Sequence, residues 1–221
     1  MVRWLALAFG CLVLIPILLT PLYAFVDPPL SAVMIEKRLG GAGIERTWTG
    51  LGDISPNLIR AVMMSEDARF CEHGGVDFVE MRAAWDHAER GGTLRGASTI
   101  TMQTVKNLFL WTGRDWVRKA LEAPLALYAD FILPKRRIME IYLNIVEWDT
   151  GVYGAGAAAQ HFFNVSPARL TAAQASRMAV TLPAPEVRDA AKPGPGMAMM
   201  ARRVSSRAAM AGPYDDCVIS R

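Results

Sequence analysis

One long apolar run opens the chain, and amphipathic stripes follow it. Residues 4–26 form an apolar stretch of 23 residues with no charged side chain. A helix of that length, rising about 1.5 Å per residue, can cross a hydrocarbon core of about 30 Å. Arg3 precedes the run, so the positive-inside rule leaves the amino terminus in the cytoplasm and sends the rest across the membrane. A cleaved signal peptide is the alternative, but no A-x-A-like site follows, and we predict an uncleaved transmembrane anchor.

The stretch after the apolar run carries no sustained periodicity. Asp27-Pro28-Pro29 marks the exit from the run, Ser31 to Arg38 fits either a short helix or a short strand, and Ile44 to Trp48 fits a short strand. We interpret this stretch as a stem. The predicted segments are a cytoplasmic tip (1–3), a transmembrane anchor (4–26), a stem (27–54), one folded domain (55–211) and a loose tail (212–221).

From Ser55 onward the apolar positions repeat with a helical period. Pro56 opens a helix that Ser55 caps, and Thr171 with Gln174 forms a capping box for a helix that we expect to stop at Pro183. The helix after Pro134 is apolar on two faces, which predicts a place at the centre of the core. No stretch alternates long enough to predict a sheet, so the expected fold class is mainly α. Further helices are predicted after an Asp77–Glu80 capping box, after Ser98 as the cap, from Trp116 to Ile132 with a bend at Pro124, and from Met197 to Met210.

Composition narrows the functional classes. The chain has 221 residues, enough for one domain with a real core, and its 52% hydrophobic content favours a membrane segment. A formal net charge of +3 suits an anionic lipid surface or a phosphorylated substrate, and it is too small to indicate nucleic acid binding.

The cysteine and histidine positions predict no metal centre. Cys11, Cys71 and Cys217 show no repeated spacing, which argues against a disulfide framework or a zinc site, although an oxidising compartment would permit a Cys71–Cys217 bridge. The three histidines do not cluster in sequence. No HExxH or GxSxG motif occurs, so zinc hydrolysis and serine esterase chemistry have no support.

Glu66 is the first candidate catalytic residue. It continues the stripe of Ile59, Val62 and Met63 at helical spacing, so its carboxylate should be partly desolvated. Desolvation raises the pKa of a carboxyl group, which suits a general acid or base near neutral pH. The alternative is a helix-end carboxylate that pairs with Arg69, three residues on.

A hydroxyl-rich loop and a group of cations form the second candidate site. Residues 96–103 read GASTITMQ and lead into a helix, where backbone donors and hydroxyls favour phosphate binding; a threonine-rich helix cap is the alternative. Four cations follow within fourteen residues and suit a diphosphate, unless they form a solvated face. Glu122 lies one turn after Arg118, so an intrahelical ion pair is its alternative role. The four cations are Lys106, Arg114, Arg118 and Lys119.

Six motifs follow the apolar run: EDARFCEHGGVD (66–77), GASTITMQTVKN (96–107), RKALE (118–122), KRRIMEIYLN (135–144), GVYGAGAAAQHFF (151–163) and LTAAQASRMAVTLPAPE (170–186). In this order and spacing they resemble the glycosyltransferase family 51 domain of peptidoglycan polymerases, the glycosyltransferase domain of penicillin-binding proteins. The resemblance covers about residues 30–205 and the anchor, and no S-x-x-K motif of a transpeptidase occurs, so the monofunctional class is expected.

The resemblance implies a role for each matching residue. Glu66 matches the catalytic base, and Glu122 matches the second glutamate, which assists departure of the diphosphate-lipid. The diphosphate and sugar would be bound by Ser98, Gln103, Lys106, Arg114, Arg118 and Lys119, and Asp67, Phe70, His73 and Asn144 would support the cleft. The implied fold is a lysozyme-like helical domain with a small membrane-facing hydrophobic jaw, for which part of 109–116 (FLWTGRDW) is the candidate.

This chain departs from the family pattern at four positions. Ala97 and Met102 replace a usual Gly and Gln, Cys71 replaces an aromatic residue, and Gln174 replaces a common Glu. None of these changes removes a group expected to transfer a proton, so they affect details of the donor site rather than the class.

The implied activity is polymerisation of lipid II into β-1,4 glycan strands by an inverting single displacement that releases undecaprenyl diphosphate. No cofactor is required, although a divalent cation, Mg²⁺ or Mn²⁺, is compatible with the chemistry. The expected partners are lipid II, the growing glycan strand, the bacterial inner membrane and other cell-wall synthesis or division proteins, with the domain on the periplasmic face. The competing hypotheses are a lysozyme-like glycan-cleaving enzyme and a non-catalytic scaffold of cell-wall synthesis.

Overall fold

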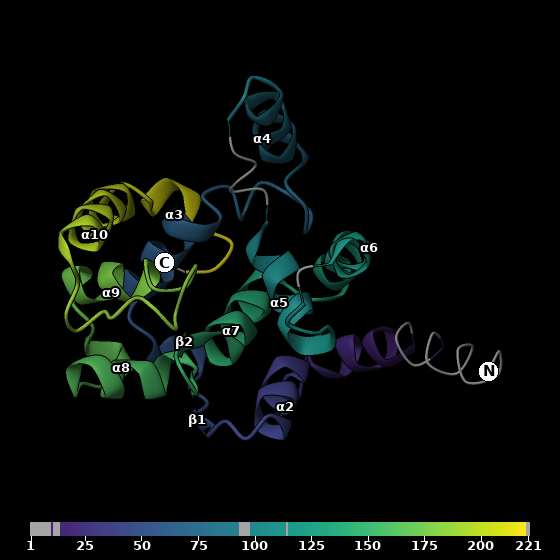
Figure 1. Ribbon diagram of the computed structural model, residues 1–221, viewed down its shortest axis with the longest axis horizontal. Helices are drawn as coiled ribbons and strands as arrows, with labels where there is room; N and C mark the ends of the chain where they lie inside the picture. Colours follow the sequence, from purple (N-terminus) through teal and green to yellow (C-terminus); the bar gives the residue numbers. More distant parts are fainter. Residues whose placement is uncertain (1–9, 11–13, 93–97, 114, 220–221) are drawn as a thin grey trace.

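Helix α7 (Lys135–Ile145) lies near the centre of the fold (Figure 1). The computed structural model describes residues 10, 14–92, 98–113 and 115–219. On α7, Ile138, Met139, Ile141 and Tyr142 have no exposed surface. The prediction of a central helix that is apolar on two faces is confirmed, and so is the mainly α class.

Two groups of helices pack around α7. In one group, α3 (Pro56–Glu66) contacts α9 (Ala172–Ala179) and α10 (Pro195–Ala209). In the other group, α5 (Ile100–Phe109) contacts both α7 and α6 (Trp116–Ile132). The end of α3 lies beside the start of α5, so residues from distant parts of the chain meet there.

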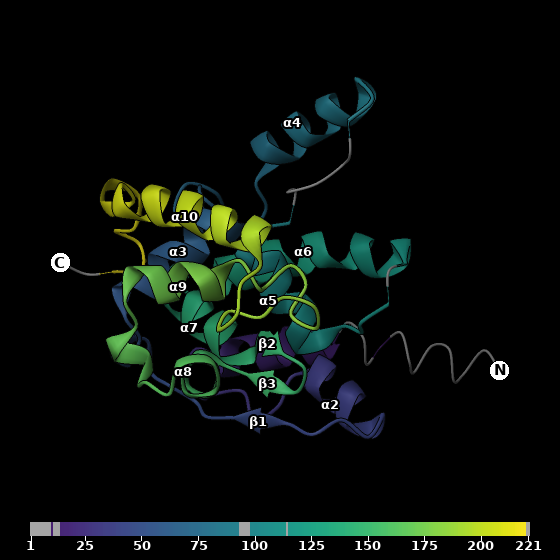
Figure 2. The same ribbon diagram turned by 60° about the vertical axis from the view of Figure 1, so that its left-hand side comes forward.

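The remaining helices lie at the edges. Helix α2 (Ala32–Leu39) packs against α5, and α8 (Ala155–Phe163) packs beside the small sheet. Helix α4 (Phe78–Glu89) has no buried residue and projects away from the body in both views (Figures 1 and 2). Short 3₁₀ turns span Leu51–Asp53, Pro167–Arg169 and Gly212–Tyr214.

A small three-stranded sheet was not predicted. Strand β3 (Val152–Tyr153) lies between β1 (Glu45–Arg46), to which it is parallel, and β2 (Glu147–Asp149), to which it is antiparallel (Figure 2). The predicted strand at 44–48 corresponds to β1. Strands of two or three residues are too short to show an alternating pattern, which is why β2 and β3 could not be recognised from the sequence.

Side-chain caps set most of the predicted helix starts. Ser55 accepts a hydrogen bond from the Asn57 amide at 3.3 Å, and the Thr171–Gln174 capping box is formed. Two predicted boundaries were wrong. Thr99, not Ser98, caps α5, because its hydroxyl accepts from the Met102 amide at 3.1 Å. Helix α9 ends at Ala179, before Pro183.

The amino-terminal segment is described only in part. Residues 14–22 are helical, and the Tyr128 hydroxyl donates to the carbonyl of Ile17 at 2.9 Å. Within the described ranges, no helix combines the length and the apolar character needed to cross a membrane. The predicted tip and anchor fall partly on residues 1–9 and 11–13, which lie outside those ranges.

Two arginines hold the chain where it leaves this segment. Arg137 donates to the carbonyls of Tyr23 at 2.7 Å and Val26 at 3.0 Å. Arg46 donates to the carbonyls of Pro28 and Pro29. The Trp48 ring contacts both guanidinium groups, at 4.9 and 5.6 Å from its centroid. Arg137 on α7 therefore holds the start of the stretch that we interpreted as a stem against the folded domain.

The prediction of a loose carboxy-terminal tail is wrong for residues 212–219. The Asp215 carboxylate is fully buried and accepts from Arg60 at 2.6 Å, and Val218 is also buried. Cys217 forms a disulfide with Cys71, with 5.6 Å between their Cα atoms. The bridge that the sequence left as an alternative is thus present, and it fastens the tail to the loop after α3.

Candidate active site

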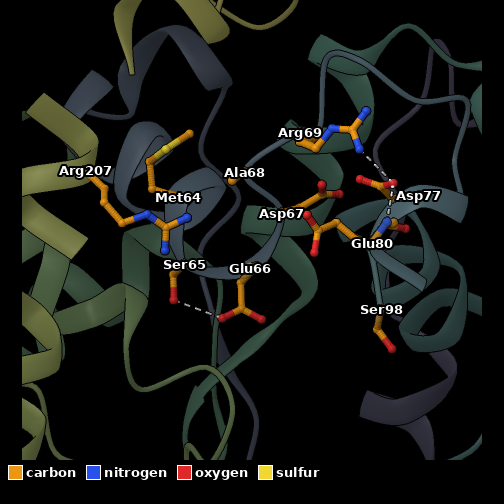
Figure 3. Close-up of a pocket in the computed structure, with 11 residues that line it drawn as sticks. Met64, Ser65, Glu66, Asp67, Ala68, Arg69, Asp77, Glu80, Ser98 and Arg207 are labelled. Carbon is orange, nitrogen blue, oxygen red and sulfur yellow. Dashed lines mark hydrogen bonds and ion pairs between the residues drawn. The ribbon is translucent and has the colours of Figure 1, made fainter. Parts of the chain in front are cut away.

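Glu66 is the last residue of α3, and its carboxylate lines a cavity of about 190 Å³ (Figure 3). Its Oε1 accepts a hydrogen bond from the Ser65 hydroxyl at 3.2 Å, and its Oε2 accepts from Nε2 of Gln103 at 3.1 Å. Burial raises the pKa of Glu66, while these two hydrogen bonds and the charge of Arg188 act in the opposite direction. The arrangement suits a carboxylate that accepts a proton near neutral pH.

The alternative interpretation of Glu66, a pair with Arg69, is wrong. Arg69 donates from Nε to Glu72 at 2.8 Å and lies 3.5 Å from the Asp77 carboxylate. Figure 3 shows its guanidinium directed toward Asp77 and away from Glu66. The carboxylate of Glu66 is therefore held by neutral donors, which leaves it able to accept a proton.

Gln103 connects Glu66 to the centre of the core. Its Nε2 donates to Glu66, and its Oε1 accepts from the hydroxyl of Tyr142 at 3.1 Å. Tyr142 is fully buried on α7, which fixes which end of the Gln103 amide faces Glu66. The side chain that the resemblance assigned to substrate binding thus also orients the candidate base.

Asp67 and His73 hold the loop that follows Glu66. Nε2 of His73 lies 3.0 and 3.1 Å from the two oxygens of Asp67, and Asp67 also accepts from the backbone amide of Ile100 at 3.0 Å. Phe70 is fully buried beneath the ammonium of Lys135, 4.5 Å from its ring centroid. These residues join the end of α3 to the start of α5 and so set the spacing between Glu66 and Gln103.

Glu122 lies on α6 and is 3% exposed. Arg118 donates to its Oε1, and Nζ of Lys119 lies 2.8 Å from its Oε2. Lys119 also donates to the Ser98 hydroxyl at 2.7 Å, which connects α6 to the loop before α5. The intrahelical ion pair that the sequence left open is formed, and it places two cations beside a buried carboxylate.

A second cavity, of about 330 Å³, adjoins this cluster. Gln103, Lys106 and Arg118 line it. Gln103 also donates to Glu66, which lines the first cavity, so this hydrogen bond connects the two cavities. Burial lowers the pKa of Lys106, and the charge of Glu122 acts in the opposite direction. The second cavity therefore offers concentrated positive charge next to the candidate base.

Known proteins resemble this chain over most of its length. The family model described as transglycosylase matches residues 33–209. The chain belongs to the transglycosylase family. A biosynthetic peptidoglycan transglycosylase of Brucella suis biovar 1 is 52% identical over 209 residues, covering 94% of this chain and 93% of the relative. The proteins of that name from Agrobacterium fabrum and Rhizobium leguminosarum bv. trifolii are 50% and 48% identical, over 94% and 97% of this chain and 92% of each relative.

Two residues predicted from the transglycosylase resemblance stand apart from the others. Arg114 lies outside the described residues, so its role at the diphosphate stays a prediction. Asn144 is buried on α7, where it accepts from the Thr49 amide and donates to the Thr49 carbonyl, both at 2.8 Å. Asn144 thus supports the segment before α3 rather than the loop that carries Glu66.

Sequence reasoning missed the charged residues that the carboxy-terminal half and α2 contribute to this transglycosylase site. Arg207 on α10 lines the cavity of Glu66, and the guanidinium of Arg188 donates to the Val180 carbonyl at 2.7 Å. Lys37, Glu147 and Glu186 line the second cavity. All of them except Glu186 lie outside the candidate motifs, and Glu186 is the last residue of one motif, so spacing along the chain did not connect these residues to the site.

No candidate metal centre is found in the ranges that the structure describes, because no three His, Cys, Asp or Glu side chains gather there in a suitable arrangement. Three cations gather in this part of the site: Arg118 and Lys119 lie beside Glu122, and Lys106 lines the adjoining cavity with Arg118.

Proposed function

We propose that this peptidoglycan glycosyltransferase polymerises lipid II into β-1,4 glycan strands. One observation carries the proposal: a partly desolvated carboxylate, Glu66, is fixed by Gln103 at the edge of a cavity lined by the cations Lys106 and Arg118. A base beside a cationic cavity suits transfer of a sugar from a diphosphate donor to a hydroxyl acceptor. The ~50% identical relatives support the same activity.

In the proposed reaction, Glu66 removes the proton from the 4-hydroxyl of the acceptor sugar. That oxygen attacks the anomeric carbon of the donor from the face opposite the diphosphate, the bond to the diphosphate breaks, and undecaprenyl diphosphate leaves with the electron pair. A single displacement converts an α-linked donor into a β-linked product, as in inverting glycosidases, where water takes the place of the sugar hydroxyl. The raised pKa of Glu66 favours this proton transfer near neutral pH.

Lys106 and Arg118 would stabilise the negative charge that grows on the departing diphosphate. Glu122 would hold Arg118 and Lys119 in place through its two carboxylate oxygens. We infer that these cations make a resident metal unnecessary, and that Mg²⁺ or Mn²⁺, when used, arrives bound to the diphosphate. Chelation should therefore leave the protein folded, and it should slow the reaction only when a divalent cation accompanies the substrate.

We also propose that residues 4–26 anchor the enzyme in the inner membrane by a single pass, with the lysozyme-like domain on the periplasmic face. The Cys71–Cys217 disulfide supports an oxidising compartment such as the periplasm. Other cell-wall synthesis or division proteins would be its partners there.

The membrane-facing jaw would be formed by α4 and the start of α6. Trp85 on α4 and Trp116 on α6 are 60% and 80% exposed, and aromatic residues favour the membrane interface. The candidate stretch at 109–116 contributes only its end: Phe109 stacks on Tyr23 at a centroid distance of 6.2 Å, and Trp111 is half-buried and donates to Asp115.

The test is to incubate the purified protein with lipid II in detergent and to resolve the products by length. Wild type should make a ladder of glycan strands, and Glu66→Gln should make none while keeping its thermal unfolding temperature. Glu72→Gln is the matched control, because Glu72 is an exposed carboxylate of the same loop that pairs with Arg69. Shortening of preformed glycan without a ladder would favour a lysozyme-like cleaving enzyme, and lipid II bound unchanged by wild type would favour a scaffold.

A further inference from the structure

Two carboxylates face the cavity that the proposed function assigns to the diphosphate. Glu147 follows α7 and is 13% exposed, and Glu186 lies in the loop after α9 and is 57% exposed. Both line the cavity with Lys106 and Arg118. Negative charge at this place opposes the binding of a polyanionic substrate, so the cavity needs a further cation to offset it.

Lys37 on α2 is placed to do so. Its Nζ lies 2.5 Å from Oε1 of Glu186 and 3.8 Å from Oε2 of Glu147, and its side chain also lines the cavity. The other oxygen of Glu147 accepts from the Gly151 amide at 3.0 Å. The hydrogen bond to Glu186 raises the pKa of Lys37, which therefore stays positively charged at neutral pH.

The preceding residue of the same helix, Glu36, contacts another residue that lines the cavity. Glu36 accepts from the Thr112 amide at 2.9 Å and from its hydroxyl at 2.6 Å, and Thr112 lines the cavity. Two consecutive residues of α2 thus contact two separate walls. Helix α2 is the first described helix after the predicted anchor, so the part of the chain nearest the proposed membrane shapes this cavity.

We propose that Lys37 is a positioning residue for the glycosyltransferase reaction: it neutralises Glu147 and Glu186 so that the cavity accepts the diphosphate of the lipid-linked substrate. This inference rests on the proposed function of the cavity. The Lys37–Glu186 pair is partly exposed, at 30% and 57%, and such pairs contribute little to the stability of a fold. Its contribution should therefore appear in substrate binding rather than in unfolding.

The charges predict the outcome of a double substitution. The group of Lys37, Glu147 and Glu186 carries a formal charge of −1, and Lys37→Met makes it −2. Adding Glu186→Gln to Lys37→Met returns the charge to −1. The double variant should then bind the substrate like the wild type although it lacks Lys37.

The experiment measures initial rates of the full-length protein on lipid II over a range of substrate and salt concentrations. Lys37→Met should raise KM about tenfold with kcat within about twofold, and the rise should shrink as salt screens the charges. Lys37→Met with Glu186→Gln should restore KM to within about twofold of wild type. Arg38→Met is the matched control, because it removes a cation of the same helix that lines a different surface hollow.

Three results would overturn the inference. An unchanged KM in Lys37→Met shows that the cavity does not need this cation. A double variant as impaired as Lys37→Met shows that Lys37 contacts the substrate directly or supports the structure, and a matching fall in unfolding temperature identifies the second case. A wild-type protein that makes no glycan overturns the proposed function, and this role with it.

Discussion

Gln103 donates a hydrogen bond to Glu66 across 3.1 Å, although the two residues lie 37 positions apart and on different helices. The contact joins the end of α3 to the first turns of α5. Since the hydrogen bond favours the ionised carboxylate, it opposes the effect of burial on the pKa of Glu66. Gln103 therefore sets how readily the candidate base carries a negative charge.

Gln103→Leu should shift the acidic limb of the pH–activity profile to higher pH. Loss of the donor raises the pKa of Glu66 further, and the base works only when ionised, so activity at low pH falls first. If the limb moves by one pH unit, the rate at a fixed pH on that limb falls about tenfold. The profile of kcat/KM between about pH 5 and pH 9 measures this. Tyr142→Phe removes the hydroxyl on the far side of Gln103 and should shift the limb less; an unmoved limb in Gln103→Leu would contradict the prediction.

Lys106→Arg should move the alkaline limb to higher pH. Burial lowers the pKa of Lys106, so the lysine loses its charge at a pH below that of an exposed lysine, whereas arginine stays charged throughout. Lys106→Met should lower kcat/KM about a hundredfold at pH values where Lys106 is charged, because a cation facing the diphosphate is lost, and the loss should shrink on the alkaline limb where the wild-type lysine is neutral too. The same kinetic profile tests both variants, with Lys192→Met as the control on an exposed loop. An alkaline limb that stays in place in Lys106→Arg would show that another group titrates there.

The helices, the partial burial of Glu66 and the ion pair of Glu122 could be predicted from the sequence because each depends on local patterns. The apolar stripe through Met63 to Glu66 indicated partial burial, and the two apolar faces of α7 indicated its central position. The predicted ion pair of Glu122 required only the spacing of Arg118 on one helix. These features involve residues that are neighbours along the chain, where helical geometry determines which side chains meet.

The features that escaped prediction depend on contacts between distant segments. Lys37 and Glu186 meet across 149 positions, and neither belongs to a periodic pattern that implies the other. The tail at 212–221 was predicted to be loose, yet the burial of Asp215 beside Arg60 and the disulfide of Cys217 hold residues 212–219 in place. Two cysteines without a recognisable spacing do not identify each other as partners.

Gly75→Ala should destabilise the domain, while Gly74→Ala should be nearly neutral. Gly75 has φ of +86°, and a Cβ there would lie 2.4 Å from the carbonyl oxygen of Ala126 on α6. Gly74 has no atom within 4 Å of an added Cβ. The strained φ alone costs about 1–3 kcal/mol, and the overlap with backbone adds to it. Urea unfolding of both variants measures the difference, and equal midpoints would contradict the close approach of Gly75 to α6.

Breaking the Cys71–Cys217 disulfide should lower the stability of the domain. The bridge closes a loop of 146 positions, and it restricts the unfolded chain more than it restricts the folded one. For a loop of this length the chain-entropy model gives about 5 kcal/mol, and removal of native disulfides typically costs about 2–5 kcal/mol. Urea unfolding with and without reductant measures the loss.

The position of the bridge predicts an effect on activity as well. Cys71 lies in the loop that carries Phe70 and His73, so release of the tail should loosen the support of Glu66 and lower kcat. A variant with both cysteines replaced by serine should match the reduced wild type in stability and rate and should not respond to reductant. If oxidised and reduced wild type unfold at the same urea concentration while mass spectrometry confirms the change of redox state, the bridge does not stabilise the domain.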